Sequence, residues 1–134
     1  MKKLLLSLIC CVSTLGFAGN CPDPSTIVIS NHKITAPSGY IASVISVIAA
    51  DSPVDFRTGV LITRIIDPKT VEIKTEECTY RVGDDESNYG YFMLNKYFID
   101  IEITDEALKQ HGWEPQNRRK WFKCEGSNAN LCEY

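Results

Sequence analysis

Four cysteines downstream of residue 20 are the side chains whose type and spacing point most directly to chemistry: Cys21, Cys78, Cys124 and Cys132. An even number of thiols in a short chain is typical of a disulfide framework in an oxidising compartment. A zinc site would need ligand pairs at close spacing, such as two cysteines with two residues between them, whereas seven residues separate Cys124 from Cys132. The pattern therefore predicts two disulfides and no metal ligand or cofactor. Four cysteines allow three pairings, and we favour Cys21 with Cys78 and Cys124 with Cys132.

Residues that act as nucleophiles, bases or cation ligands do not form a recognisable catalytic set. The sequence has no G-x-S-x-G, no H-E-x-x-H and no phosphate-binding loop, and its two histidines, His32 and His111, lie in polar, turn-like contexts. The acidic run Asp84-Asp85-Glu86 lacks the spacing of a calcium-binding loop and is expected to be a solvated hairpin tip. We therefore expect that the protein is not an enzyme. A small secreted hydrolase or metal-dependent enzyme is the alternative.

A cluster of basic and aromatic residues near the end of the chain is the strongest candidate for an interaction surface. Such residues are enriched at protein interfaces, and here they could receive an acidic partner or a glycan. The competing interpretation is that the rings divide between core and surface while the charges are solvated. We call this set the candidate surface: Trp113, Arg118, Arg119, Lys120, Trp121 and Lys123.

The first eighteen residues have the three parts of a secretory signal peptide. Two lysines are followed by an apolar run, Leu4 to Val12, and Gly16-Phe17-Ala18 supplies small residues before a cleavage site. The apolar run is shorter than the ~20 residues needed to span a bilayer. We therefore predict a signal peptide at residues 1–18 and a single β-rich domain at residues 19–134, in the periplasm or secreted and not spanning the membrane.

The charge of the expected mature domain limits its partners. Residues 19–134 contain 12 basic and 17 acidic side chains, a net charge of −5. A negative surface argues against general affinity for nucleic acid or anionic membranes. The length suits one hydrophobic core. A protein is therefore the expected partner.

The elements that position these residues are expected to be strands, because apolar and polar side chains alternate in several segments. In Thr70–Glu76 the side chains assigned to the core are Val71, Ile73 and Thr75, and those assigned to water are Glu72, Lys74 and Glu76. The other strand-like runs are Thr26–Ser30, Tyr40–Ala50, Gly59–Ile66, Cys78–Val82, Tyr89–Leu94, Tyr97–Ile103, Trp121–Cys124 and Leu131–Tyr134. Capping residues and a terminal glycine predict one short helix over Thr104–Gly112.

About eight short strands and one helix describe a mainly β fold, either a small antiparallel β-sandwich or an open barrel. Within it, Cys78–Val82 and Tyr89–Leu94 are expected to form a hairpin around the turn residues Gly83–Asn88. An exposed stiff loop of this kind would also suit a secreted inhibitor, which is a further alternative.

Three short motifs around the cysteines allow comparison with known families: Cys21-Pro22, Cys78-Thr79-Tyr80, and the end from Cys124 to Cys132-Glu133-Tyr134. This layout is similar to that of small exported proteins of intracellular γ-proteobacteria. That group includes domain-of-unknown-function families and EirA-like periplasmic proteins associated with type IV secretion. The resemblance implies no catalytic residues. It implies a periplasmic role that supports secretion and intracellular growth. From the signal peptide, the cysteine pairs and the missing catalytic set we expect an exported, non-enzymatic binding protein, either a periplasmic accessory of a secretion system or a host-associated factor.

Overall fold

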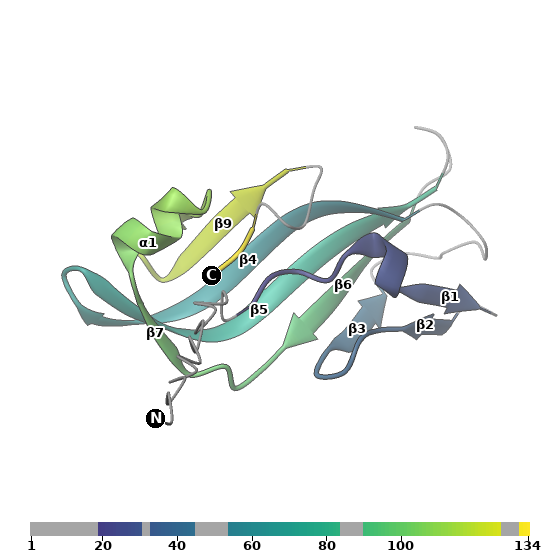
Figure 1. Cartoon of the computed structure of the whole chain (residues 1–134), viewed down its shortest axis with the longest axis horizontal. Coiled ribbons are helices and arrows are strands. Elements are labelled where there is room, and N and C mark those ends of the chain that lie inside the picture. Colours follow the sequence, from purple (N-terminus) through teal and green to yellow (C-terminus); the bar gives the residue numbers. More distant parts are fainter. Residues whose placement is uncertain (1–18, 31–32, 45–53, 84–89, 127–131) are drawn as a thin grey trace, which may run out of the picture.

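A computed structural model describes residues 19–30, 33–44, 54–83, 90–126 and 132–134 of the chain (Figure 1). The expected signal peptide and the expected acidic hairpin tip lie outside the described residues, as does His32. Residues 45–50 of the expected strand Tyr40–Ala50 and the first residue of the expected strand Leu131–Tyr134 also lie outside them.

Antiparallel strands dominate the described part of the chain. The elements, in order, are the 3-10 turn η1 (Pro24–Thr26), the strands β1 (Val28–Ser30), β2 (Lys33–Thr35), β3 (Ile41–Val44), β4 (Val54–Asp67), β5 (Thr70–Val82), β6 (Gly90–Lys96) and β7 (Ile101–Thr104), the helix α1 (Asp105–Gln110), and the strands β8 (Glu114–Gln116) and β9 (Trp121–Glu125). The mainly β class, the antiparallel pairing, the single short helix and both favoured disulfides, Cys21–Cys78 and Cys124–Cys132, are confirmed.

Seven strands form one sheet in the order β3-β6-β5-β4-β9-β8, with β7 pairing with β5, and β1 and β2 form a separate hairpin. The two longest strands, β4 and β5, make a central hairpin that runs the length of the molecule in Figure 1. The expected hairpin of Cys78–Val82 with Tyr89–Leu94 is present as the pairing of β5 with β6. The segments Thr70–Glu76 and Cys78–Val82, expected as two strands, form the single strand β5.

The turn between β4 and β5 is closed by a side chain. Oδ1 of Asp67 accepts a hydrogen bond from the backbone N–H of Lys69 at 2.8 Å. Asp favours turns because its short carboxylate can bond to the backbone two residues further on. This bond holds the pKa of Asp67 below its ordinary value. The residues Asp67-Pro68-Lys69 therefore reverse the chain between β4 and β5.

Helix α1 begins and ends where its sequence indicates. The Thr104 hydroxyl accepts a hydrogen bond from the N–H of Ala107 at 3.2 Å, and Gly112 follows the helix with φ of 85°. A capping hydroxyl satisfies an N–H that has no partner inside the helix, and glycine adopts positive φ at low cost. Leu108 is its fully buried residue. No helix in the described segments is long and apolar enough to cross a membrane.

Strand β7 is shorter than expected. The alternation of Tyr97–Ile103 predicted a strand throughout, but β7 begins at Ile101. Phe98 and Asp100 have φ of 57° and 54°, values that interrupt an extended chain. Phe98, in this irregular segment, is 88% exposed.

The core lies on one face of the sheet. In Figure 1 the segment before β1 and the last described residues cross this face on the near side, and α1 lies at the edge of the sheet beside β9. Tyr80 packs between two rings there, stacked on Phe92 at 5.2 Å and edge-on to Phe56 at 5.7 Å between ring centroids. Offset and edge-to-face pairs of this kind add to the stabilisation from buried apolar area. This covered face carries the candidate site.

Candidate functional site

A β-bulge turns Glu76 toward the core. Ile62 of β4 pairs with Thr75, but the next residue, Thr63, pairs with Ile73, so Lys74 is an extra residue in β5. One extra residue reverses which side chains face each side of the sheet. Glu76, expected on the wet face, is therefore fully buried, and the assignment of Thr75 to the core face is wrong for the same reason.

One hydroxyl holds the buried carboxylate. The Tyr40 hydroxyl donates to Oε1 of Glu76 at 2.5 Å, and the same hydroxyl lies 3.1 Å from the backbone oxygen of Asn20. The other carboxylate oxygen, Oε2, is buried without a hydrogen-bond partner, and so is the hydroxyl of Tyr134. Buried polar atoms without partners are rare in folded proteins because each forfeits its hydration.

Burial has the largest effect on the pKa of Glu76. It raises the pKa of Glu76 above its ordinary value, while the hydroxyls of Tyr134 and Tyr40 and the charge of Lys96 oppose the rise. Tyr134 is thus close enough to affect the carboxyl pKa, although the two groups do not meet with good hydrogen-bond geometry. Burial, followed by the charge of Glu76, also raises the pKa of Tyr40, Tyr80 and Tyr134. The protonated forms of all four groups are favoured.

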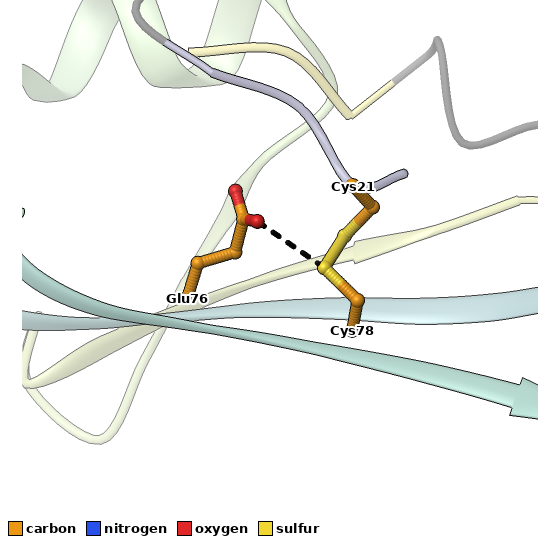
Figure 2. A group of neighbouring side chains, drawn as sticks. All are labelled: Cys21, Glu76 and Cys78. Atoms are coloured by element: carbon orange, nitrogen blue, oxygen red, sulfur yellow. Dashed lines mark hydrogen bonds between the residues drawn. A yellow bond between two sulfur atoms is a disulfide. The ribbon is translucent and has the colours of Figure 1, made fainter. Parts of the chain in front are cut away.

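The first disulfide lies against this carboxylate. Figure 2 shows Glu76 and Cys78 on the same side of β5, with Cys21 reaching them from the N-terminal segment. Sγ of Cys78 is 3.4 Å from Oε1 of Glu76. This sulfur is part of a disulfide and carries no proton, so the contact is not a hydrogen bond. One ligand atom from each of the three residues lies within 4.8 Å of the others. Thiolates, not disulfide sulfurs, are the ligands metals prefer.

Both ends of the described domain are fastened beside this cluster. The N–H and C=O of Gly19 each bond to the backbone of Tyr134 at 2.9 Å, and the Tyr80 hydroxyl donates to the carbonyl of Pro22 at 2.5 Å. The indole N–H of Trp113 donates to the carbonyl of Glu133 at 2.7 Å. We call residues 19–23 and 132–134 the terminal clasp. The clasp covers Glu76 and seals it from solvent.

Strand β4 has a glycine where the clasp and core meet. A Cβ at Gly59 would lie 2.9 Å from the Trp113 ring and 3.4 Å from Sγ of Cys21. Distances below about 3 Å are steric clashes between carbon atoms. The absence of a side chain at Gly59 therefore allows the indole and the disulfide to pack on the sheet.

The candidate surface is divided between several environments. Trp113 is fully buried, so its placement on a surface is wrong, because its ring fills the space above Gly59. Trp121 is half-buried on the opposite face of the sheet, where it pairs with Ile62. Lys123 lies on that face too and forms an ion pair with Glu125.

The turn before β9 contains the three consecutive basic residues of the candidate surface, Arg118, Arg119 and Lys120, and places them in different environments. Arg119 is held by Asp105 through Nε to Oδ2 at 2.5 Å and Nη2 to Oδ1 at 2.9 Å, and Nη2 also donates to the carbonyl of Asp67 at 3.0 Å. Arg119 therefore joins the start of α1 to the β4–β5 turn. Arg118 and Lys120 are exposed. The structure brings Trp121 and Lys123 together, and it assigns Arg119 a structural role.

A shallow pocket of about 300 Å³ lies beside the clasp, with Asn20, Tyr40 and Lys96 in its lining. The Lys96 ammonium is 5.6 Å from the centre of the Tyr40 ring. Since the hydroxyl of that ring bonds to Glu76, Tyr40 separates the pocket from the carboxylate. A larger depression of about 410 Å³, lined by Pro68, Thr104 and their neighbours, lies between the β4–β5 turn and α1, away from the cluster.

The comparisons with known proteins return no relatives: no family model, no curated protein and no solved structure matches this chain. Its function must therefore be argued from its own geometry.

Glu76 is the residue that sequence analysis missed. The available signal was its position two residues before Cys78, since side chains two apart in a strand share a face, and a disulfide cysteine is expected inside.

Proposed function

We propose that this chain is an exported protein that binds another protein and performs no catalysis. The two disulfides support export, because such bonds persist in oxidising compartments. The sealed position of Glu76 supports a non-enzymatic role. A general acid must come within hydrogen-bond reach of its substrate, whereas both oxygens of this carboxylate lie beneath the terminal clasp.

The observation that carries the binding role is the exposed sheet face opposite the clasp. Its central residues come from β4 and β9, and we call them the outer face: Val60, Ile62, Arg64, Trp121 and Lys123. Ile62 is 37% exposed and lies directly across from the half-buried ring of Trp121. Tryptophan and arginine are enriched among the residues that dominate interface energies. An apolar pair bordered by two ion pairs, Arg64 with Glu72 and Lys123 with Glu125, fits a protein interface.

The resemblance in the cysteine motifs supports a more specific version of this proposal. A periplasmic accessory of a secretion system would need stability outside the cytoplasm and a surface for an envelope partner. The disulfides provide the first requirement, and the outer face offers the second.

Site-specific photocrosslinking in cells tests the proposal. A photoreactive amino acid replaces Ile62 or Arg64 on the outer face, and a control places it at Glu106, which is exposed on α1. We expect a discrete crosslinked species in the periplasmic fraction from the outer-face positions and none from the control. Trp121→Ala should weaken the crosslink from position 62 at equal protein level. Identical products from all three positions, or no product from any, would contradict the proposal.

A further inference from the structure

The cluster of Cys21, Cys78 and Glu76 has a donor set suited to a soft metal ion once the sulfurs are reduced. We propose that the reduced domain binds one Zn²⁺ through the two thiolates and the Glu76 carboxylate. This site is invisible in the sequence, since Cys21 and Cys78 are 57 positions apart. It lies beneath the terminal clasp, away from the outer face, and is independent of the proposed function.

The spacing of the ligand atoms is close to that of a zinc site. Zinc binds sulfur at about 2.3 Å and carboxylate oxygen at about 2.1 Å, so a tetrahedron places those two ligands about 3.6 Å apart. Sγ of Cys78 and Oε1 of Glu76 are already 3.4 Å apart. The two sulfurs must separate from a bond of about 2.05 Å to about 3.8 Å, a movement of about 0.9 Å each. Side-chain rotation provides this movement while the Cα atoms stay near their 5.8 Å separation.

The surroundings of Glu76 also fit a ligand. Oε2 is a fully buried acceptor without a partner, and a cation held by both carboxylate oxygens would satisfy it. The Tyr40 hydroxyl that donates to Oε1 would orient the carboxylate, as outer partners of metal ligands commonly do. Two thiolates and one carboxylate exceed the charge of Zn²⁺ by one, and Lys96, directly opposite Glu76 on β6, supplies a positive charge. Sulfur donors favour zinc over calcium or magnesium.

The reduced form arises in two ways. A newly made chain has free thiols before any oxidant reaches it. Alternatively, a dithiol reduces the disulfide: the bond between the two sulfurs breaks, each sulfur gains a hydrogen atom, and the dithiol becomes its own disulfide. Zn²⁺ then displaces one proton from each thiol. The metal would take the place of the disulfide in tying the clasp to β5.

Zinc titration of the reduced protein tests this site. Purified protein is reduced with a phosphine, and Zn²⁺ is added in competition with a chromogenic chelator. The double variant C124S/C132S keeps the proposed ligands, and C21S/C78S removes them while keeping an equal number of thiols. We expect one Zn²⁺ per chain for C124S/C132S, bound at least 100-fold more tightly than by C21S/C78S. Glu76→Gln in the C124S/C132S background should weaken binding at least tenfold.

Cobalt(II) provides a second readout. Its absorption should show thiolate-to-metal charge transfer and the d–d bands of a tetrahedral ion in C124S/C132S only. If the metal-free reduced chain is unfolded, Zn²⁺ should restore its near-ultraviolet circular dichroism, again only in C124S/C132S. Equal affinity of the two double variants would overturn the proposal. Unchanged affinity after Glu76→Gln would remove Glu76 from the site.

Discussion

The carboxyl group of Glu76 is in an unfavourable place for a charge, buried close to three tyrosines and a disulfide. Its raised pKa means that folding favours the protonated form. The stability that this form contributes is present in full below the ordinary pKa of about 4.5 and is lost as the pH rises through the higher pKa of the folded state. Charge at this position therefore opposes folding near neutral pH.

Glu76→Gln should reveal this effect in the oxidised protein. Glutamine keeps the size of the side chain and cannot ionise, so its stability relative to the wild type should increase with pH. The slope can reach about 1.4 kcal/mol per pH unit between the two pKa values of Glu76. Urea unfolding at a series of pH values measures it. Glu77→Gln, which makes the same replacement at a half-buried position on the opposite face of β5, is the control. Parallel profiles for Glu76→Gln and wild type would contradict the expectation.

Gly59 gives a steric prediction. A methyl group at this position meets the Trp113 ring at 2.9 Å. Overpacking a filled core costs about 1 to 3 kcal/mol, so Gly59→Ala should lower the free energy of unfolding by that amount. Thr58→Ala, on the neighbouring half-buried position of the same strand, serves as the control. Denaturant unfolding that finds equal stability in Gly59→Ala and wild type would show that the indole can move aside.

The cysteine pairing could be predicted from the sequence and the burial of Glu76 could not, because the two depend on different information. An even set of thiols has few pairings, and the favoured one is present. The side of the sheet on which Glu76 lies depends on Lys74. Lys74 is an extra, unpaired residue because the register of β4 and β5 shifts after Ile62. A register shift is a property of two paired strands, so the alternation of apolar and polar residues within one segment cannot predict it.

At the scale of elements, Arg119 connects three separate pieces of chain. Its guanidinium bonds to Asp105 at the start of α1 and to the carbonyl of Asp67 in the β4–β5 turn, while its own carbonyl accepts from the Thr63 hydroxyl at 2.8 Å. The neighbouring residue, Arg118, has φ of 55° in the same turn. A residue that looked available for binding therefore fixes how α1 lies on the sheet.

Arg119→Lys should lower the melting temperature of the domain, whereas Arg118→Lys should not. Lysine keeps the charge but cannot form the two parallel bonds that a guanidinium makes with a carboxylate. Thermal unfolding followed by circular dichroism compares the two variants. Equal melting temperatures would show that the Asp105 pair contributes nothing to the attachment of α1.

The helix and the hairpin of β5 with β6 were predictable because their signals are local. Thr104 and Gly112 mark the ends of α1, and turn-forming residues follow Val82 in the sequence. The hairpin of β4 with β5 was not predicted, although Asp67 closes its turn. The short strand β8 was missed, since Glu114-Pro115-Gln116 has no alternation of apolar and polar residues. The burial of Trp113 was missed as well, because its position depends on Gly59, 54 residues earlier in the sequence.

At the scale of the whole molecule, the two disulfides should differ in their effect on stability. Cross-linking limits the unfolded chain more when the closed loop is longer. Cys21–Cys78 spans 57 positions and Cys124–Cys132 spans 8. The chain-entropy relation gives about 4 kcal/mol for the first and about 2.6 kcal/mol for the second.

Paired replacement by alanine tests this difference. The C21A/C78A variant should lose at least about 1 kcal/mol more than C124A/C132A in urea unfolding. The measurement is made with a chelator present so that no metal contributes. A larger loss for C124A/C132A would mean that native packing at the second disulfide outweighs the entropy of the longer loop.

The class of the fold followed from the sequence, while the order of its strands did not. Alternation and turn residues predict mainly β structure, but the neighbours β4 and β9 are joined only through contacts between segments about sixty residues apart. The outer face likewise depends on that pairing, which sets Trp121 opposite Ile62.

The backbone bonds between Gly19 and Tyr134 make this domain nearly a closed ring. A short glycine linker joining these two residues would need to bridge only a small gap. The chain could then be reopened in the exposed turn at Pro68 and Lys69, so that the new ends emerge at the far tip of the β4–β5 hairpin. Such a circular permutant should fold with the same disulfides. It would leave the seam between Gly19 and Tyr134 free of any fused tag or label.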